Sequence, residues 1–353
     1  MRSILPCAKN WCRWAFEKGK HMNRLDKFRG CLVGGGAGDA LGYAVEFLHE
    51  EMIFDRYGPA GIQAYSLMDG AALISDDTQM TLFTAKGLME HKGENPVHSV
   101  NLSYLDWLRT QQSPFTGEDK AFLMDEEKLY SRRAPGNTCL FALERGGMGT
   151  PEHAVNDSKG CGGVMRAAPA GLYTERKGAS LTDALRLGAG VAALTHGHPL
   201  GWLPGAALAG MVHMLVAGER DIPAAAERVL HEMQRCWPDR EETAAFAAYL
   251  RFALQLAANR KEDLSNIHRL GEGWVGDEAL GIAVYCAARY PDDFEKALLA
   301  AVNHNGDSDS TGAICGNILG ARLGLQGIPE KFLHHLELKD LILHTAYRLY
   351  QCK

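Results

Sequence analysis

The sequence predicts an all-α domain, and three observations lead to this prediction. Several segments rich in Ala and Leu carry apolar residues at three- and four-residue spacing, the pattern of amphipathic helices. Few stretches show the period-two alternation of a half-buried strand. Prolines and Gly-Pro steps fall at ordinary intervals and mark loops between helices, with no long linker. The clearest helical segments are 179–194, 205–217, 224–234, 241–258, 277–289 and 291–302.

Length and composition restrict the possible functions. A chain of 353 residues with 46% hydrophobic content can bury a sizeable core. A net charge of −6 argues against a general nucleic-acid binder, which needs clustered Lys and Arg. No run approaches the roughly 18 apolar residues of a membrane span, and the N-terminus lacks the apolar stretch of a secretion signal. The nine cysteines never form CxxC, which favours a reducing cytoplasm over disulfides or structural zinc.

A glycine-rich segment, residues 30–46, is the first unusual element. Its glycines fit neither GxGxxG nor GxxxxGK, so both familiar phosphate-binding motifs fail. A segment of this composition is also typical of a helix packed tightly in a core, and both interpretations stay open at this point.

Ser75-Asp76-Asp77-Thr78 is the first of two short acidic clusters. Ser75 is a good N-cap for a helix expected over residues 76–90, and carboxylates stabilise the positive end of the helix dipole. Taken alone, this cluster is therefore explained more readily by helix capping than by metal binding.

The second acidic cluster, residues 306–311, precedes a stripe of glycines at every fourth position, Gly312, Gly316 and Gly320. Each glycine costs a helix about 1 kcal/mol relative to Ala, which indicates that another backbone packs closely against this stripe. An EF-hand-like or merely solvated acidic loop is the alternative interpretation, although the closing Glu of a full EF-hand is absent. Carboxylates and hydroxyls suit Mg²⁺ and Mn²⁺, so the two clusters together predict a split metal site.

Two further elements are weaker. The glycine-rich turn before Arg166, residues 159–165, can offer backbone N–H groups to a phosphate, with Arg166 pairing with that phosphate or with a carboxylate. His196 and His198 are two residues apart and do not share a helix face, so a two-histidine metal site is not predicted. Residues 111–134 are irregular and are expected to form a surface excursion beside a site.

In this order, the elements resemble the ADP-ribosylglycohydrolase family. The resemblance runs from about residue 24 to the C-terminal region. Its motifs are GDALG at 38–42 with Glu46, SDDT at 75–78, RAPGNT at 133–138, GCGGVMR at 160–166, Thr195-His196, GWV at 273–275 with EAL at 278–280, and DSDS at 307–310.

The resemblance implies an orthogonally packed helical domain over residues 23–353, preceded by an extension of residues 1–22. It also implies a cleft that holds two Mg²⁺ or Mn²⁺ ions, with Asp309 as the bridging carboxylate. The family often has Thr where this chain has serine at two ligand positions, and the hydroxyl is kept. The implied metal ligands are Ser75, Asp76, Asp77, Asp307, Asp309 and Ser310.

Further roles follow from the same resemblance. Glu46 corresponds to the family's mobile glutamate and, with Asp77 and Asp309, is expected to be catalytic. Gly162 and Gly163 are expected to cradle the diphosphate, with His196 close to the same ligand. Asp39 is expected to be a supporting residue.

The implied activity is metal-dependent removal of ADP-ribose from a modified protein side chain. Arginine is the expected acceptor by family analogy, and the sequence itself does not select arginine over serine. An alternative is an immunity protein that also binds an ADP-ribosyltransferase toxin through residues 1–22, where Trp11, Trp14 and Phe16 are typical interface anchors. Met22 as the true start would remove that segment. A catalytically inactive relative is a third possibility, which the intact ligand set argues against.

Overall fold

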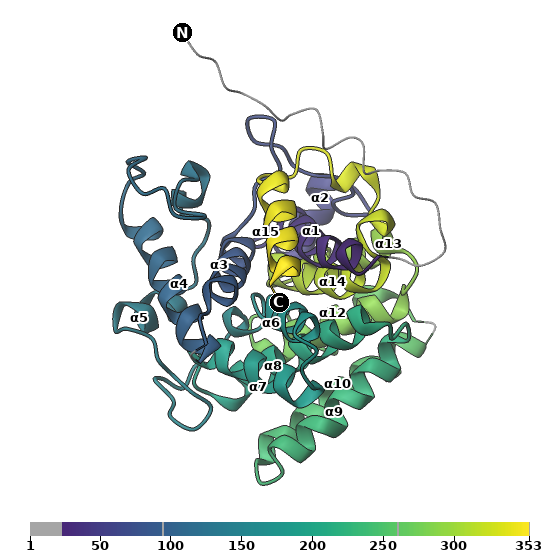
Figure 1. Cartoon of the computed structure of the whole chain (residues 1–353). Coiled ribbons are helices and arrows are strands. Elements are labelled where there is room, and N and C mark those ends of the chain that lie inside the picture. Colours follow the sequence, from purple (N-terminus) through teal and green to yellow (C-terminus); the bar gives the residue numbers. More distant parts are fainter. Residues whose placement is uncertain (1–22, 94, 260, 353) are drawn as a thin grey trace.

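Helices are the regular secondary structure of residues 23–93, 95–259 and 261–352, the part of the chain that the computed structural model describes (Figure 1). Within those ranges only isolated β-bridges occur, and no strand forms. The all-α prediction is confirmed. The α-helices are α1 (Arg24–Gly42), α2 (Glu50–Tyr57), α3 (Asp76–Glu90), α4 (Pro96–Gln112), α5 (Asn137–Glu144), α6 (Ala168–Arg176), α7 (Leu181–Ala193), α8 (Pro199–Ala217), α9 (Ile222–Cys236), α10 (Glu241–Ala258), α11 (Asp263–Ile267), α12 (Gly276–Arg289), α13 (Phe294–Val302), α14 (Ser308–Leu323) and α15 (Lys339–Gln351).

The glycine-rich segment is helix α1, which packs antiparallel against α14 (Figure 1). A Cβ added at Gly38 would lie 1.9 Å from the carbonyl oxygen of Gly312, and one at Gly316 would lie 1.9 Å from that of Gly34. Only glycine allows two helix backbones to approach so closely. The close packing expected from the glycine stripe of α14 is confirmed, and the nucleotide-loop interpretation of residues 30–46 is wrong.

This antiparallel contact decides where the acidic residues lie. A Cβ at Gly42, the last residue of α1, would touch the carbonyl oxygen of Ser308 at 2.1 Å. The C-terminal end of α1 therefore lies beside the N-terminal end of α14. Glu46 follows α1 by four residues, and Asp307 caps α14, so the two carboxylates meet although 261 residues separate them in the chain.

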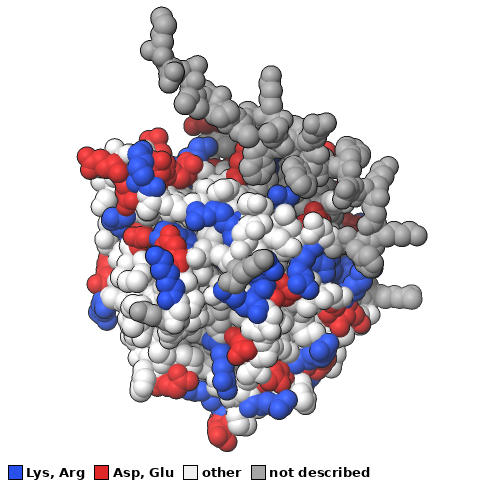
Figure 2. All heavy atoms as spheres, viewed as in Figure 1, with Lys and Arg blue, Asp and Glu red and all other residues white. Residues whose placement is uncertain are grey.

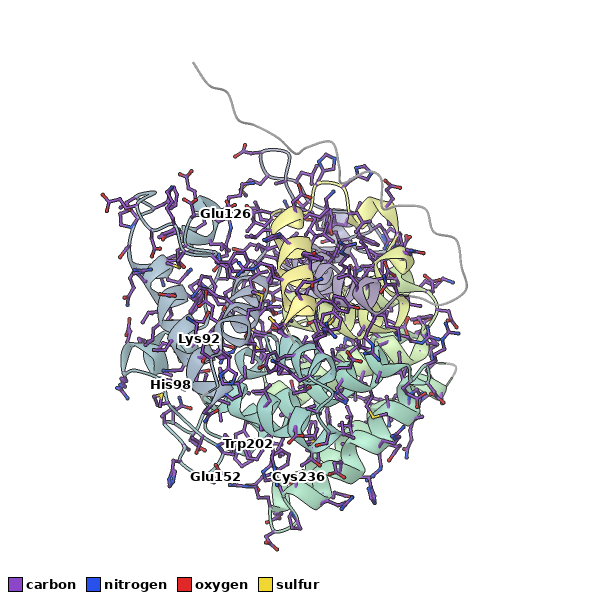
Figure 3. All side chains as sticks on the ribbon, in the orientation of Figure 1. Lys92, His98, Glu126, Glu152, Trp202 and Cys236 are labelled. Atoms are coloured by element: carbon purple, nitrogen blue, oxygen red, sulfur yellow. The ribbon has the colours of Figure 1, made fainter. Side chains whose placement is uncertain are left out.

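Helix α8 begins earlier than the sequence indicated. It starts at Pro199 rather than at residue 205, and Pro204 lies inside it. The first position of a helix tolerates proline, because its missing N–H would have no partner there, so Pro199 begins α8 instead of marking a loop. At the end of α9, Trp237 packs edge-on against buried Trp202 with ring centroids 5.2 Å apart. Trp202 and Cys236, the last residue of α9, are labelled in Figure 3.

The expectation that no segment approaches the length of a membrane span is wrong for α8. Of the described helices, it alone is long and apolar enough, with 19 residues and a mean hydropathy of 1.5. However, 83% of its apolar window is buried inside the protein. Packing against the surrounding helices accounts for its composition, because a helix that is apolar all round belongs in a core.

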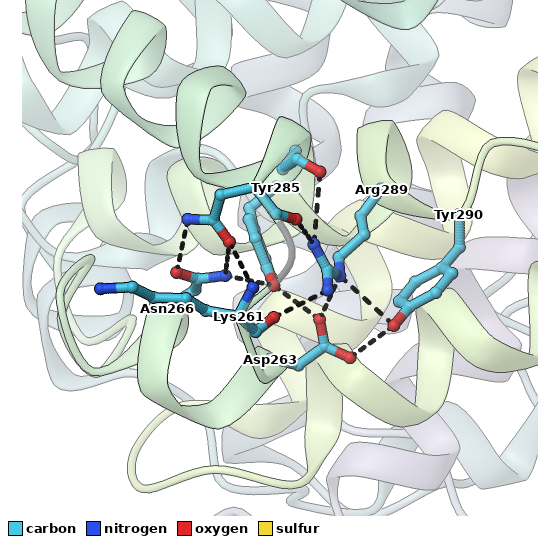
Figure 4. Close-up of polar contacts among 8 residues, drawn as sticks. Lys261, Asp263, Asn266, Tyr285, Arg289 and Tyr290 are labelled. Carbon is cyan, nitrogen blue, oxygen red and sulfur yellow. Dashed lines mark hydrogen bonds and ion pairs between the residues drawn. The ribbon is translucent and has the colours of Figure 1, made fainter.

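The connection between α10 and α12 is fixed by a polar network (Figure 4). Asp263 accepts hydrogen bonds from the hydroxyls of Tyr285 and Tyr290, at 2.5 and 2.7 Å, and forms an ion pair with Arg289 at 2.8 Å. Arg289 also donates to the carbonyl oxygen of Asn259 at 2.5 Å. The network ties this connection to α12, the helix whose first turn supports a loop of the candidate site. On the face shown in Figure 2, basic and acidic side chains are interspersed rather than separated.

Candidate functional site

Asp39, near the end of α1, supports the start of α3. Its carboxylate accepts hydrogen bonds from the backbone N–H of Ser75 at 2.9 Å and of Thr78 at 3.0 Å, and also from the Thr78 hydroxyl. Burial raises the pKa of Asp39 to about 6, although these hydrogen bonds oppose the rise. Asp39 thus satisfies backbone donors that a helix N-terminus leaves unpaired. Its position agrees with the supporting role expected from the sequence.

The first acidic cluster is held at the N-terminus of α3 from two sides. The Ser75 hydroxyl caps the helix by accepting from the N–H of Asp77 at 3.1 Å. The N–H of Asp76 donates to the carbonyl oxygen of Arg133 at 3.0 Å, and the Asp76 carboxylate accepts from the N–H of Gly136 at 3.2 Å. The irregular region 111–134 thus ends in contact with the acidic cluster, as its expected position beside a site requires.

The second acidic cluster is the N-terminus of α14. Asp307 caps this helix by accepting from the N–H of Ser310 at 3.3 Å, and Asp309 accepts from the same N–H at 3.0 Å. The other oxygen of the Asp307 carboxylate accepts from the Cys161 thiol at 2.6 Å. Sequence reasoning did not place Cys161 here. The only sequence feature that could have pointed to Cys161 is its position inside the glycine-rich turn, residues 159–165.

Carboxylates from two segments, the turn after α1 and the start of α14, come together in the interior. One oxygen of Glu46, one of Asp307 and one of Asp309 lie within 4.8 Å of one another, and all three residues are buried. One Glu46 oxygen and one Asp77 oxygen are fully buried without a hydrogen-bond partner. Among the described residues, no ion pair involves any of these four carboxylates. No cationic side chain of the described residues therefore forms an ion pair that would neutralise this cluster.

Burial and mutual repulsion change the acidity of the cluster. The pKa of Glu46 is raised to about 9, mainly by burial and to a smaller extent by repulsion from Asp307. Burial also raises the pKa of Asp76 to about 8. The pKa values of Asp77 and Asp309 are raised well above the ordinary range, first by burial and then by neighbouring carboxylates. The protein alone cannot hold all these groups ionised at neutral pH without a large electrostatic cost.

The donor set fits a hard divalent cation. Carboxylate and hydroxyl oxygens are the ligands that Mg²⁺ and Mn²⁺ prefer, and the cluster offers both. One buried oxygen of Glu46 and one of Asp77 accept no hydrogen bond, so both are free to coordinate such an ion. Of the residues that the sequence grouped as ligands, Asp307 and Asp309 lie with Glu46 in one buried cluster. Ser75, Asp76 and Asp77 lie at the N-terminus of α3, and their role as ligands stays a prediction.

The glycine-rich turn adjoins the cluster through the Cys161 thiol. It forms the 3-10 turn η3 (Cys161–Gly163). Among the described residues, no backbone carbonyl outside this turn accepts a hydrogen bond from the N–H of Gly162. His196 packs against the turn, because a Cβ added at Gly162 would be 2.9 Å from the His196 ring. Burial, with a smaller contribution from Arg166, lowers the pKa of His196 to about 3, so its imidazole is neutral.

The interpretation of Arg166 as a phosphate or carboxylate ligand is wrong. Its side chain is 0% exposed and donates to the sulfur atoms of Met80 and Cys139, each at 3.1 Å, and to the Thr195 hydroxyl. Its guanidinium lies 4.6 Å from the centroid of the Tyr104 ring. Sequence position next to the glycine-rich turn suggested a ligand role, but packing directs the side chain into the core.

Fold and site together define a helical protein with an oxygen-rich acidic centre beside a glycine-rich turn. The sequence model of the ADP-ribosylglycohydrolase family matches residues 20–353. The chain therefore belongs to the ADP-ribosylglycohydrolase family, and the resemblance seen in the motifs is confirmed. By family it is a glycohydrolase that acts on ADP-ribose.

Comparison with individual proteins gives the same result. The chain is 28% identical over 324 residues to the ADP-ribosyl-[dinitrogen reductase] glycohydrolase of Rhodospirillum rubrum, covering 89% of this chain and 91% of that protein. It is 26% identical to the ADP-ribosylarginine hydrolase Tri1 of Serratia proteamaculans, covering 92% and 79%. A solved structure titled "ADP-ribosylglycohydrolase-related protein complex" matches with a TM-score of 0.62 and 25% identity, over 93% of this chain and 98% of that one.

Proposed function

We propose that this protein is a metal-dependent hydrolase that removes ADP-ribose from modified arginine side chains of proteins. The observation that carries the proposal is the buried group of Glu46, Asp307 and Asp309, which forms no ion pair with a cationic side chain of the described residues. The proposed ligands of two Mg²⁺ or Mn²⁺ ions are Ser75, Asp76, Asp77, Asp307, Asp309 and Ser310.

Each part of the site has a task in this chemistry. Divalent cations, when bound, would polarise the ribose diol and a water molecule near the anomeric carbon. The carboxylates of Glu46, Asp77 and Asp309 would stabilise the positive charge of an oxocarbenium-like transition state. The N–H groups of Gly162 and Gly163 would bind the diphosphate, as backbone donors at a turn do in other phosphate sites. The neutral imidazole of His196 packs against that turn and adds no charge to it.

The choice of arginine as the acceptor is supported by the name of the Serratia relative, an ADP-ribosylarginine hydrolase. The test measures release of free ADP-ribose from peptides modified on arginine and from peptides modified on serine. We expect release from the arginine peptide, loss of release with EDTA, and recovery with Mg²⁺ or Mn²⁺. Asp77→Ala should be inactive while it still folds. Absence of ADP-ribose release from the arginine peptide would contradict the proposal, whether or not the serine peptide is cleaved.

The proposal does not include a toxin partner. Residues 1–22, on which that alternative rests, lie outside the described residues, and neither the Rhodospirillum nor the Serratia relative carries a name that indicates toxin binding. We do propose a reducing compartment, the cytoplasm, because the cysteines of the described residues are free thiols.

A further inference from the structure

Two exposed aromatic rings lie side by side next to the acidic centre. Phe47 is 69% exposed and Trp274 is 42% exposed, and their rings stack with centroids 6.3 Å apart and planes at 21°. Among the exposed large apolar side chains of the described residues, no other two rings stack. Single exposed apolar residues are ordinary, whereas a contiguous pair beside a polar site marks a binding surface.

The loop that carries Trp274 is joined directly to the proposed metal centre. The carbonyl oxygen of Glu272 accepts from the N–H of Asp307 at 2.9 Å, and a Cβ added at Gly273 would lie 3.5 Å from the Cβ of Asp307. The carbonyl oxygen of Trp274 accepts from the N–H of Cys161 at 3.2 Å. The Trp274 ring therefore stands on a loop that touches both the acidic cluster and the glycine-rich turn.

Phe47 belongs to a second segment of the same centre, the one that carries Glu46. It follows Glu46, whose carboxylate lies within 4.8 Å of those of Asp307 and Asp309. The turn around it is closed by a hydrogen bond from the N–H of Leu48 to the carbonyl oxygen of Val45 at 2.9 Å. The ring pair thus joins the segment of Glu46 to the loop beside Asp307, on the solvent side of buried carboxylates.

The Trp274 loop is held in one conformation. Gly271 and Gly273 have φ values of 115° and 85°, which other residues rarely adopt. The Glu278 carboxylate, in the first turn of α12, accepts from the N–H groups of Glu272 and Gly273 at 3.0 and 3.2 Å. A loop whose backbone is already held loses little conformational entropy when a side chain on it binds a ligand, which is the property expected of a recognition loop.

We propose that Phe47 and Trp274 bind the guanidinium group of the ADP-ribosylated arginine and so select arginine as the acceptor. This inference rests on the proposed function. A guanidinium remains planar and cationic after glycosylation, so it can stack on aromatic faces, and the nearby carboxylates attract its charge. The serine of an ADP-ribosylated peptide offers neither a plane nor a charge at this position. The ring pair therefore distinguishes acceptors and does not act on the bond that is cleaved.

The test compares Phe47→Ala and Trp274→Ala with the wild type on ADP-ribosyl-arginine peptides. Removing a cation–π interaction from a partly desolvated site predicts a rise in KM of roughly threefold to thirtyfold for each variant. The value of kcat and the affinity for free ADP-ribose should stay unchanged, and so should whatever release the wild type gives from ADP-ribosyl-serine peptides. Trp274→Phe and Phe47→Tyr, which keep a ring, should restore most of the loss. Tyr347→Ala is the matched control, because Tyr347 is 38% exposed on α15.

Three results would overturn the inference while leaving the proposed function intact. The alanine variants show wild-type KM for the arginine peptide, or they weaken ADP-ribose binding equally, or they affect arginine and serine peptides alike. The second result would place the rings on the nucleotide. A wild-type protein that cleaves no arginine peptide contradicts the proposed function itself, and the inference fails with it. Thermal unfolding of each variant separates these effects from misfolding, and both side chains are exposed enough to be truncated safely.

Discussion

Gly38→Ala should separate α1 from α14 and thereby disable the site without touching a proposed ligand. The new Cβ would lie 1.9 Å from the carbonyl oxygen and 2.2 Å from the carbonyl carbon of Gly312. Non-bonded atoms do not approach so closely, so the two backbones must move apart by roughly 1 Å. Alanine favours the helix by about 1 kcal/mol, but overpacking in a core costs about 1–3 kcal/mol and more when backbone must shift.

The net result should be a loss of about 2 kcal/mol or more in unfolding free energy, seen as a Tm lower by several degrees. A displacement of roughly 1 Å at reacting groups can lower the rate about a hundredfold, so ADP-ribose release should fall more than stability alone explains. Gly36→Ala is the control on the same helix. Its Cβ would meet only side-chain atoms, the nearest being Ile342 at 3.0 Å, so Tm and activity should stay close to wild type. Wild-type stability and activity in Gly38→Ala would refute the packing argument.

Three further predictions concern charge and hydrogen bonding. In EDTA, Tm should fall as pH rises from 4.5, the ordinary pKa of Glu, towards about 9, the raised pKa of Glu46. The reason is that native Glu46 keeps a proton which the unfolded state releases over this range. Added Mg²⁺ should make Tm less dependent on pH. Asp39→Asn should lower the unfolding free energy by about 2 kcal/mol, since one amide cannot accept from all three donors of α3; an unchanged denaturation midpoint would argue against this cap. Arg166→Lys should destabilise by about 1–3 kcal/mol in thermal unfolding, because an ammonium cannot span Thr195, Met80 and the face of Tyr104 together, and a neutral outcome would show that charge alone matters.

Local periodicity in the sequence was sufficient to predict the helical class and the close contact made by α14. The glycines at every fourth residue indicated a backbone neighbour, because their cost to the helix needs compensation by packing. The pattern could not name that neighbour, and the glycine-rich residues 30–46 stayed ambiguous until α1 was seen against α14. Contacts such as Cys161 with Asp307 join residues 146 apart and leave no local pattern.

Errors arose where one local signal has two meanings, or where tertiary packing overrides it. Pro199 was expected to mark a loop, yet it begins α8, because the first turn of a helix does not need its missing N–H group. Arg166 follows a phosphate-like turn, but the fold directs it to Thr195 and two sulfur atoms in the core. The exposed pair of Phe47 and Trp274 could not be found from sequence, since the rings belong to distant loops and have no common motif.

Helix capping and cation binding by the acidic clusters are compatible in this structure, because a carboxylate or hydroxyl oxygen that accepts one hydrogen bond keeps a second lone pair for a cation. One oxygen of Asp307 caps α14 while its carboxylate also belongs to the group with Glu46 and Asp309. The Ser75 hydroxyl caps α3 with one lone pair and keeps another. The N-termini of α3 and α14 both direct their positive dipole ends at the carboxylates, which lowers the cost of gathering negative charge before any cation binds. The capping signals in the sequence were therefore not competitors of the metal-site hypothesis but part of how this fold can hold such a site.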